Sequence, residues 1–181
     1  DHTDPLTYNH STSVTIYDSL GESHVQTTYF VKDNAAPNQW AIFTSVDGVK
    51  VDATAPAADL TTTAGGHTGV TVQFTTSGLH IPNGDISLEA LGTPGAGVYG
   101  GGPDGTQALT VRLNNPTQFS AGFEVTSLEQ DGLTVGRLTG VEIGPDGLVK
   151  ATYSNGSSEP LGRLAMARFR NEQGLTQIGN T

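Results

Sequence analysis

Residues 14–33, VTIYDSLGESHVQTTYFVKD, decide the fold class of this 181-residue chain. Apolar and polar side chains alternate on both sides of Asp18-Ser-Leu-Gly21. A period of two is typical of β-strands, and a short Asp- and Gly-containing interruption is typical of a tight turn. The segment therefore predicts a β-hairpin around a glycine turn.

The alternation continues toward the C-terminus. Trp40, Ile42 and Val46 share one face of the next predicted strand, so we expect Trp40 to pack in the core. Asp47-Gly48 then offers the two φ > 0 positions of a tight hairpin turn. Together these features predict a meander of three or four strands.

Later segments repeat the pattern. We expect strands at 70–74, 86–91 and 109–113, and loops at 53–68 and 92–105, where small residues and glycines dominate. In the last third, Asp146-Gly147 and Asn155-Gly156 predict two type I′ turns in a meander that returns through a strand at 161–169.

Composition fits this reading, because 24 glycines and 9 prolines separate short apolar bursts. Residues 1–126 carry twelve acidic residues against three basic ones, whereas 127–181 carry six against five. We predict an all-β chain of two β-rich domains, sandwich- or barrel-like, built from meanders and hairpins with very little helix.

Charge and residue types exclude several classes of function. The formal net charge of −10 argues against nucleic-acid and anionic-membrane partners, which need concentrated cations, and is explained by solubility. No apolar run reaches the roughly 18 residues of a membrane-spanning helix. The chain has no cysteine and hence no disulfide or thiolate. Because it starts at Asp1 without Met, we interpret it as a fragment.

No constellation for catalysis or metal binding emerges. The five histidines lack the spacing of a zinc site, and we expect His24 in a surface or cross-strand position. Gly100 to Gly102 lack the Lys-Ser/Thr of a phosphate loop, and no nucleophile elbow occurs. Paired carboxylates or weak calcium binding at Asp-rich turns remain open alternatives. We predict no catalytic residue, cofactor or metal.

Two segments resemble the flagellar hook and rod axial-protein family. The first is residues 14–43 and the second residues 136–181, whereas 47–115 carries no motif of this family. The residues that match the family pattern in the first segment are Tyr17, Asp18, Ser19, Gly21, His24, Tyr29, Phe30 and Trp40. Those in the second are Asp146, Gly147, Tyr153, Asn155, Gly156, Leu161, Gly162, Phe169, Gly174 and Leu175.

The resemblance implies a structural subunit of the bacterial flagellar hook, the extracellular flexible joint between rod and filament. Such subunits self-assemble into a tube and contact other axial proteins. On this map residues 1–118 would form the outer domain and 119–181 the C-terminal part of the inner domain, whose N-terminal half is missing. The terminal helical segments of the family are missing as well, so we expect this fragment alone to be monomeric.

An extracellular adhesin or carbohydrate-binding β-sandwich is the alternative. It would account for the all-β pattern and for Trp40 equally well. A Trp40 ring exposed as a platform would favour this alternative, and a buried ring would favour the structural role.

Overall fold

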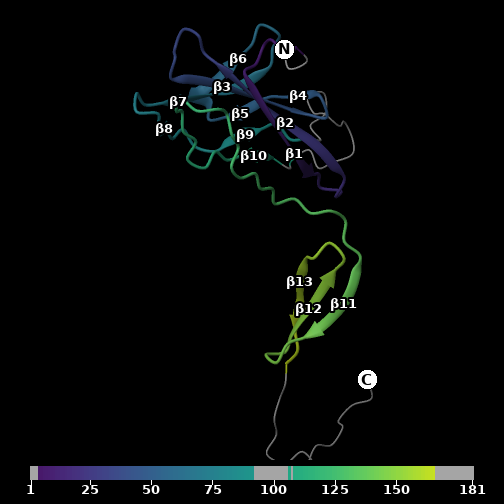
Figure 1. Ribbon diagram of the computed structural model, residues 1–181. Coiled ribbons are helices and arrows are strands. Elements are labelled where there is room, and N and C mark those ends of the chain that lie inside the picture. The colour runs from purple at the N-terminus through teal and green to yellow at the C-terminus, as the bar shows by residue number, and fades with distance from the viewer. Residues whose placement is uncertain (1–3, 92–105, 107, 166–181) are drawn as a thin grey trace, which may run out of the picture. The chain divides into compact units, whose positions relative to one another are not determined.

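A computed structural model describes residues 4–91, 106 and 108–165 (Figure 1). The described chain is built of strands with one turn of 3-10 helix, which confirms the predicted all-β class. It divides into two compact units, residues 1–134 and 135–181. The elements of the first unit are β1 (His10–Tyr17), β2 (Ser23–Lys32), β3 (Gln39–Val46), β4 (Val49–Val51), β5 (Ala53–Ala55), η1 (Ala57–Asp59), β6 (Leu60–Thr62), β7 (Thr68–Phe74), β8 (His80–Ile81), β9 (Ile86–Leu88) and β10 (Leu109–Val111).

The larger sheet of the first unit has seven strands in the order β1-β2-β3-β7-β6, with β4 paired to β3 and β8 to β7. The predicted hairpin is confirmed, since β1 and β2 pair antiparallel with Ile16 opposite His24. The predicted meander is confirmed as well, because β2, β3 and β4 follow one another antiparallel. Asp47 and Gly48 have φ values of 48° and 77°, as the tight turn requires.

A second, three-stranded sheet of order β10-β9-β5 packs against the first. The shared core takes alternate residues from both sheets, because successive side chains of a strand point to opposite faces. Its buried apolar members are Ile16, Ile42, Val46, Val51, Ala53, Val70, Val72, Ile86, Leu88 and Leu91.

The prediction of a loop at 53–68 is wrong. This segment holds β5, η1, β6 and the first residue of β7. Small residues hid the strands, yet Ala53 is buried and pairs with Leu88 of β9. The other predicted loop, 92–105, lies outside the described residues.

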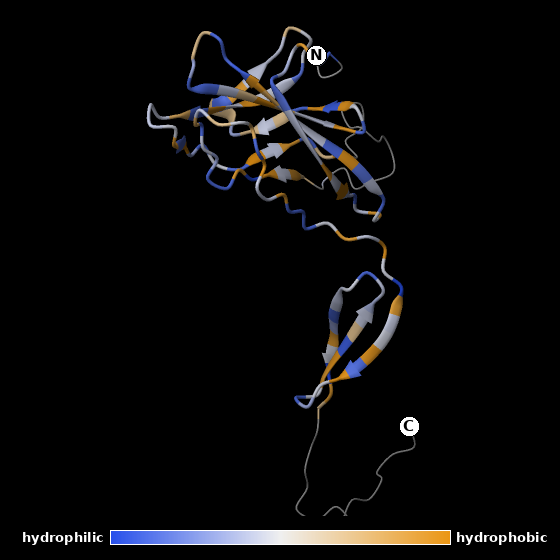
Figure 2. Cartoon of the chain, viewed as in Figure 1, coloured by the Kyte–Doolittle hydropathy of each residue, from blue (hydrophilic) through white to orange (hydrophobic). Residues whose placement is uncertain are grey.

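The second unit is an antiparallel meander of β11 (Leu138–Ile143), β12 (Leu148–Tyr153) and β13 (Ser158–Arg163). Its last strand differs from the predicted strand at 161–169, because β13 begins at Ser158 and ends at Arg163, with Leu164 and Ala165 outside it. Residues beyond 165 are not described. In Figure 2 hydrophobic and hydrophilic residues alternate along β11. Such alternation gives a sheet one apolar face.

The two turns of this unit are not of type I′. Gly147 and Gly156 have φ values of 76° and 82°, but Asp146 and Asn155 do not lie at positive φ. The amides of Gly147 and Gly156 instead donate to the carbonyls of Gly144 and Tyr153, three residues back. This is the pattern of a three-residue loop with a bulge at the glycine. The Asp146 and Asn155 side chains accept hydrogen bonds from the amides two residues on. These hydrogen bonds stabilise the three-residue loops.

These turns predict unequal effects of substitution. A Cβ at Gly147 would lie 2.8 Å from the carbonyl oxygen of Leu164, whereas nothing lies within 4 Å of one at Gly156. We expect Gly147→Val to destabilise the full-length protein by about 2–3 kcal/mol and Gly156→Val by about 1–2 kcal/mol. Thermal denaturation measures both, with Gly162→Val as the strand control. Equal, negligible shifts for the two turn variants would contradict the assignment.

Candidate functional site

The family-matching residues of the first segment build the turn between β1 and β2. The Asp18 side chain accepts hydrogen bonds from the amides of Leu20 at 2.9 Å and Glu22 at 2.8 Å. Gly21 has a φ of 77° and donates its amide to the Asp18 carbonyl. Asp18 is therefore a turn cap, and the glycine supplies the left-handed conformation that other residues adopt at a cost.

His24 links this turn to the turn between β3 and β4. Its Nδ1 lies 3.0 Å from Asp47 Oδ2, and its Nε2 lies 3.5 Å from Asp18 Oδ2. Asp47 Oδ1 also accepts a hydrogen bond from the amide of Val25. We call Asp18, His24 and Asp47 the turn clip, because they join two turns at one end of the larger sheet. The sequence analysis missed Asp47 as a partner.

Of the surface and cross-strand positions expected for His24, the surface position is wrong, since only 5% of the residue is exposed. The reason is that β1 and β2 place it opposite Ile16, on the face that packs against the core. Gln26 and Thr28 of β2 are buried on the same face. The more polar side of this strand thus faces inward.

The electrostatics of the turn clip favour an ion pair between His24 and its two carboxylates. Burial acts to lower the pKa of His24, but the hydrogen bonds and charges of Asp47 and Asp18 outweigh it and raise the pKa above its ordinary value. Burial likewise acts to raise the pKa of Asp18, but the amides of Glu22 and Leu20 together with His24 lower it. The two carboxylates thus favour the imidazolium form of His24 over the neutral imidazole.

Asp18 and His24 also form, with Glu22, a group of metal-ligand type, whose ligand atoms all lie within 4.8 Å of one another. A metal ion would need the neutral imidazole and would have to displace the proton that the two carboxylates stabilise. The arrangement therefore favours the protonated clip. The absence of a metal site stays a prediction.

The aromatic motif residues divide between the two faces of the sheet. Phe30 lies on the core side of the sheet. On the same side, the ring centres of His10 and Phe123 lie 4.5 Å apart, and those of His10 and Trp40 lie 6.1 Å apart. Trp40 is half-buried, and its Nε1 donates to Gln118 at 3.0 Å. The ring is thus a packed, hydrogen-bonded group rather than a free platform. Tyr17 lies at the other end of β1, beside Gly132, and Ser19 is exposed in the turn.

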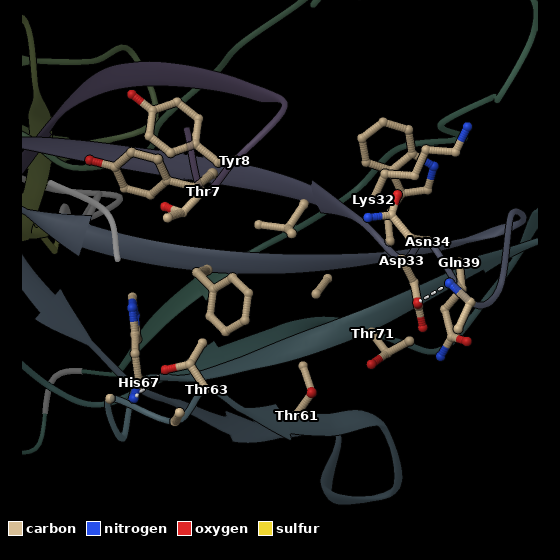
Figure 3. Close-up of a pocket in the computed structure, with 18 of the residues that line it drawn as sticks. Thr7, Tyr8, Lys32, Asp33, Asn34, Gln39, Thr61, Thr63, His67 and Thr71 are labelled. Carbon is tan, nitrogen blue, oxygen red and sulfur yellow. Dashed lines mark hydrogen bonds between the residues drawn. The ribbon is translucent and has the colours of Figure 1, made fainter. Parts of the chain in front are cut away.

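Tyr29 belongs to the opposite face of the larger sheet, where it contributes to an open groove of about 860 Å³ (Figure 3). Tyr8 packs edge-on against Tyr29 with ring centres 4.9 Å apart. Phe43 and His67 lie in contact on the other side, with ring centres 5.2 Å apart. Lys32 and Lys50 are also among the residues that line it. The sequence analysis missed this groove, although Phe43 directly follows the core residue Ile42 and therefore points to the opposite face of the strand.

The motif residues of the second unit hold its turns and strands. Asp146 pairs with Arg163 at 3.3 Å across the first turn, next to Gly147. Tyr153 lies in β12, and Leu161 and Gly162 lie in β13. Asn155 and Gly156 form the second turn. Phe169, Gly174 and Leu175 lie outside the described residues. The described motif residues thus lie partly in turns and partly in strands of both units.

Turn caps, a buried cluster of charged groups and packed rings are the structural features of this all-β chain. In the part of the chain that the structure describes, no helix is long and apolar enough to cross a membrane. The sequence profile of the flagellar basal body protein FlaE D2 domain matches residues 1–133. The chain belongs to the flagellar hook protein family that carries this domain.

Individual relatives extend the similarity over nearly the whole chain. The flagellar hook protein FlgE of Salmonella typhimurium is 31% identical over 177 residues, which cover 98% of this chain and 39% of the relative. FlgE of Treponema pallidum is 30% identical over 194 residues, covering 93% and 41%. The crystal structure of Helicobacter pylori flagellar hook protein FlgE2 matches with a TM-score of 0.47 at 20% identity, covering 94% of this chain and 35% of that one. The chain spans about two fifths of the length of these two relatives.

Proposed function

We propose that this chain is part of a structural subunit of the bacterial flagellar hook. The observation that carries the proposal is the similarity to hook proteins along 98% of the chain, together with a matched motif that builds a buried clip. The subunit would self-assemble outside the cell into the tube that joins rod to filament, in contact with other axial proteins. It would have no catalytic role.

The architecture suits a joint that bends while it turns. Such a joint needs domains that keep their shape and contacts between them that slide, which favours small polar interfaces. The turn clip and the shared core of two sheets stiffen the first unit. We propose that residues 1–118 serve as the outer domain and 119–181 as the returning part of the inner domain. By its contacts, the segment 119–134 groups with the first compact unit.

Immunoelectron microscopy tests the proposal. An antibody raised against residues 4–134 should label a short curved segment between the cell body and the flagellar filament. An in-frame deletion of these residues in the gene should abolish swimming. Labelling confined to the filament, the membrane or the medium would overturn the proposal.

We expect residues 1–181 alone to be monomeric at micromolar concentration. A formal net charge of −10 makes copies repel one another, and salt screens this repulsion only beyond about 8 Å at physiological strength. Small polar contacts of less than about 1,200 Å² give weak affinity. Sedimentation velocity in dilute buffer measures the oligomeric state, and a stable dimer at low micromolar concentration would contradict the prediction.

A further inference from the structure

The groove on the outer face of the larger sheet combines aromatic walls with positive charge. Tyr8, Tyr29 and Phe43 supply apolar surface, and Figure 3 shows Lys32 at the opposite end from Tyr8 and His67. Lys50 also lines the groove and donates a hydrogen bond to the carbonyl of Gly66. The volume of about 860 Å³ is within the usual range of binding sites, roughly 300–1,000 Å³.

The charge of this groove stands out against its surroundings. Residues 1–134 hold fourteen acidic residues and three basic ones, Lys32, Lys50 and Arg112. Both lysines line the groove, where Lys50 lies 3.7 Å from Asp52 Oδ2, and Arg112 pairs with Asp85 at 2.9 Å. Asp33 is the one carboxylate among the groove residues. An acidic partner therefore meets less repulsion at the groove than at the rest of the unit.

The same unit presents a segment with the complementary chemistry, residues 124–131. It has no regular structure, and every residue in it is exposed. Glu124 and Glu129 lie on either side of Val125 and Leu128, whose exposed fractions are 40% and 49%. The segment thus offers carboxylates for the lysines and apolar side chains for the aromatic walls. Exposed apolar side chains of this kind mark interaction sites when they gather in one place.

Contacts within the unit hold both ends of this acidic segment. Phe123 stacks on His10 and contacts Phe30, and Gly132 lies beside Tyr17 at the other end of β1. These contacts fix the segment along the edge of the sheet that β1 forms. At the Phe123 end it lies on the face of the sheet that carries His10 and Phe30, which is the core-facing side. The aromatic wall formed by Tyr29 and Phe43 lies on the opposite face, and none of residues 124–131 lines the groove of its own copy.

We propose that the groove of one copy receives the acidic segment 124–131 of a second copy. This inference rests on the proposed function, because it names one contact of the assembled subunits. Two different patches that fit each other form a head-to-tail contact, which builds open helical assemblies rather than closed dimers. The contact is small, in keeping with a monomeric fragment and a polymer held together by many copies.

Charge reversal in the full-length protein, assembled in cells, tests the contact. Lys32→Glu with Lys50→Glu should lower the amount of hook recovered per cell at least tenfold, and adding Glu124→Lys with Glu129→Lys should restore it. Lys150→Glu is the control, because Lys150 is an exposed cation of the second unit and does not line the groove. We expect the control to leave hook yield unchanged. Unchanged yield for the double lysine variant would overturn the inference.

Cross-linking gives a second readout, because these 181 residues contain no cysteine. In assembled hooks, Lys50→Cys with Glu129→Cys should give a ladder of disulfide-linked subunits on oxidation, and Arg112→Cys with Glu129→Cys should not. A linked monomer without a ladder would show that the groove binds its own chain, and would overturn the inference. If antibody-labelled hooks contain the variant but show no cross-link, the inference is overturned and the proposed function stands. If the unsubstituted protein is absent from hooks, the proposed function itself is overturned.

Discussion

At pH 6, replacing His24 with alanine should lower the free energy of unfolding of the first unit by about 3 kcal/mol. The substitution removes the cation between Asp18 and Asp47 and leaves the Asp18 carboxylate, 2% exposed, without its charged partner. Breaking a buried ion pair from one side costs about 3–5 kcal/mol, and we take the lower end because the Asp47 side chain is 37% exposed. Urea denaturation followed by the fluorescence of the single tryptophan measures the loss.

A double-mutant cycle separates the ion pair from packing. In an Asp18→Asn background the buried charge is absent, while the amide oxygen can still accept from Leu20 and Glu22. The His24→Ala substitution should then cost clearly less than in the wild-type background. The same cost in both backgrounds would show that His24 acts by filling space, and a loss below about 0.5 kcal/mol would contradict the clip altogether.

The clip also fixes the pH dependence of stability. The pKa of folded His24 is raised above its unfolded value of about 6.5, so its contribution is fully present below that pH and is lost as the pH rises through the folded value. The pKa of folded Asp18 is lowered, so its contribution is present above the unfolded pKa of about 3.9 and is lost as the pH falls through the folded value. The stability difference between wild type and His24→Ala should therefore be larger at pH 6 than at pH 9. A difference independent of pH would count against an imidazolium in the clip.

The alternation of residues 14–33 predicted the strands but not which side of them faces inward. Val25 on the more apolar side of β2 is 49% exposed, whereas Gln26 and Thr28 on the other side are buried. A period of two fixes only which residues share a face. Here both faces of the sheet are partly covered. The second sheet packs against one face, and the side chains that line the groove shield part of the other. Tertiary packing therefore decided the orientation.

The turn clip shows a similar limit. The sequence predicts the Asp47-Gly48 turn and the family motif that contains Asp18 and His24, but these parts lie 23 or more residues apart. Their meeting depends on the register of two hairpins, with Ile16 opposite His24 and Gln26 opposite Val46. Once that register is known, His24 falls next to the 47–48 turn. The groove depends in addition on strands β6 and β7, of which β6 was expected to be loop.

The second unit buries little of its own apolar surface. Val141 and Ile143 of β11 stand opposite Ala151 and Val149 of β12 on one face, yet Val141 and Ile143 are 54% and 58% exposed. Among the described residues of the unit, Ala151 is the one buried apolar side chain. A small sheet is stable only when a hydrophobic face is covered. We therefore expect this sheet to depend on a cover that the described residues of the unit do not supply.

Hydrogen exchange measures this dependence residue by residue. In the protein of residues 1–181, amides of β12 should exchange at least about a thousand-fold faster than those of β3, because β12 opens locally at little cost while β3 lies in the middle of a seven-stranded sheet. In the full-length protein the same β12 amides should become protected, whereas those of β3 should change little. Equal protection of β12 and β3 in residues 1–181 would show that the meander is stable without a cover. Since β12 is hydrogen-bonded on both sides in this sheet, rapid exchange there would reflect opening of the whole meander rather than fraying of an edge.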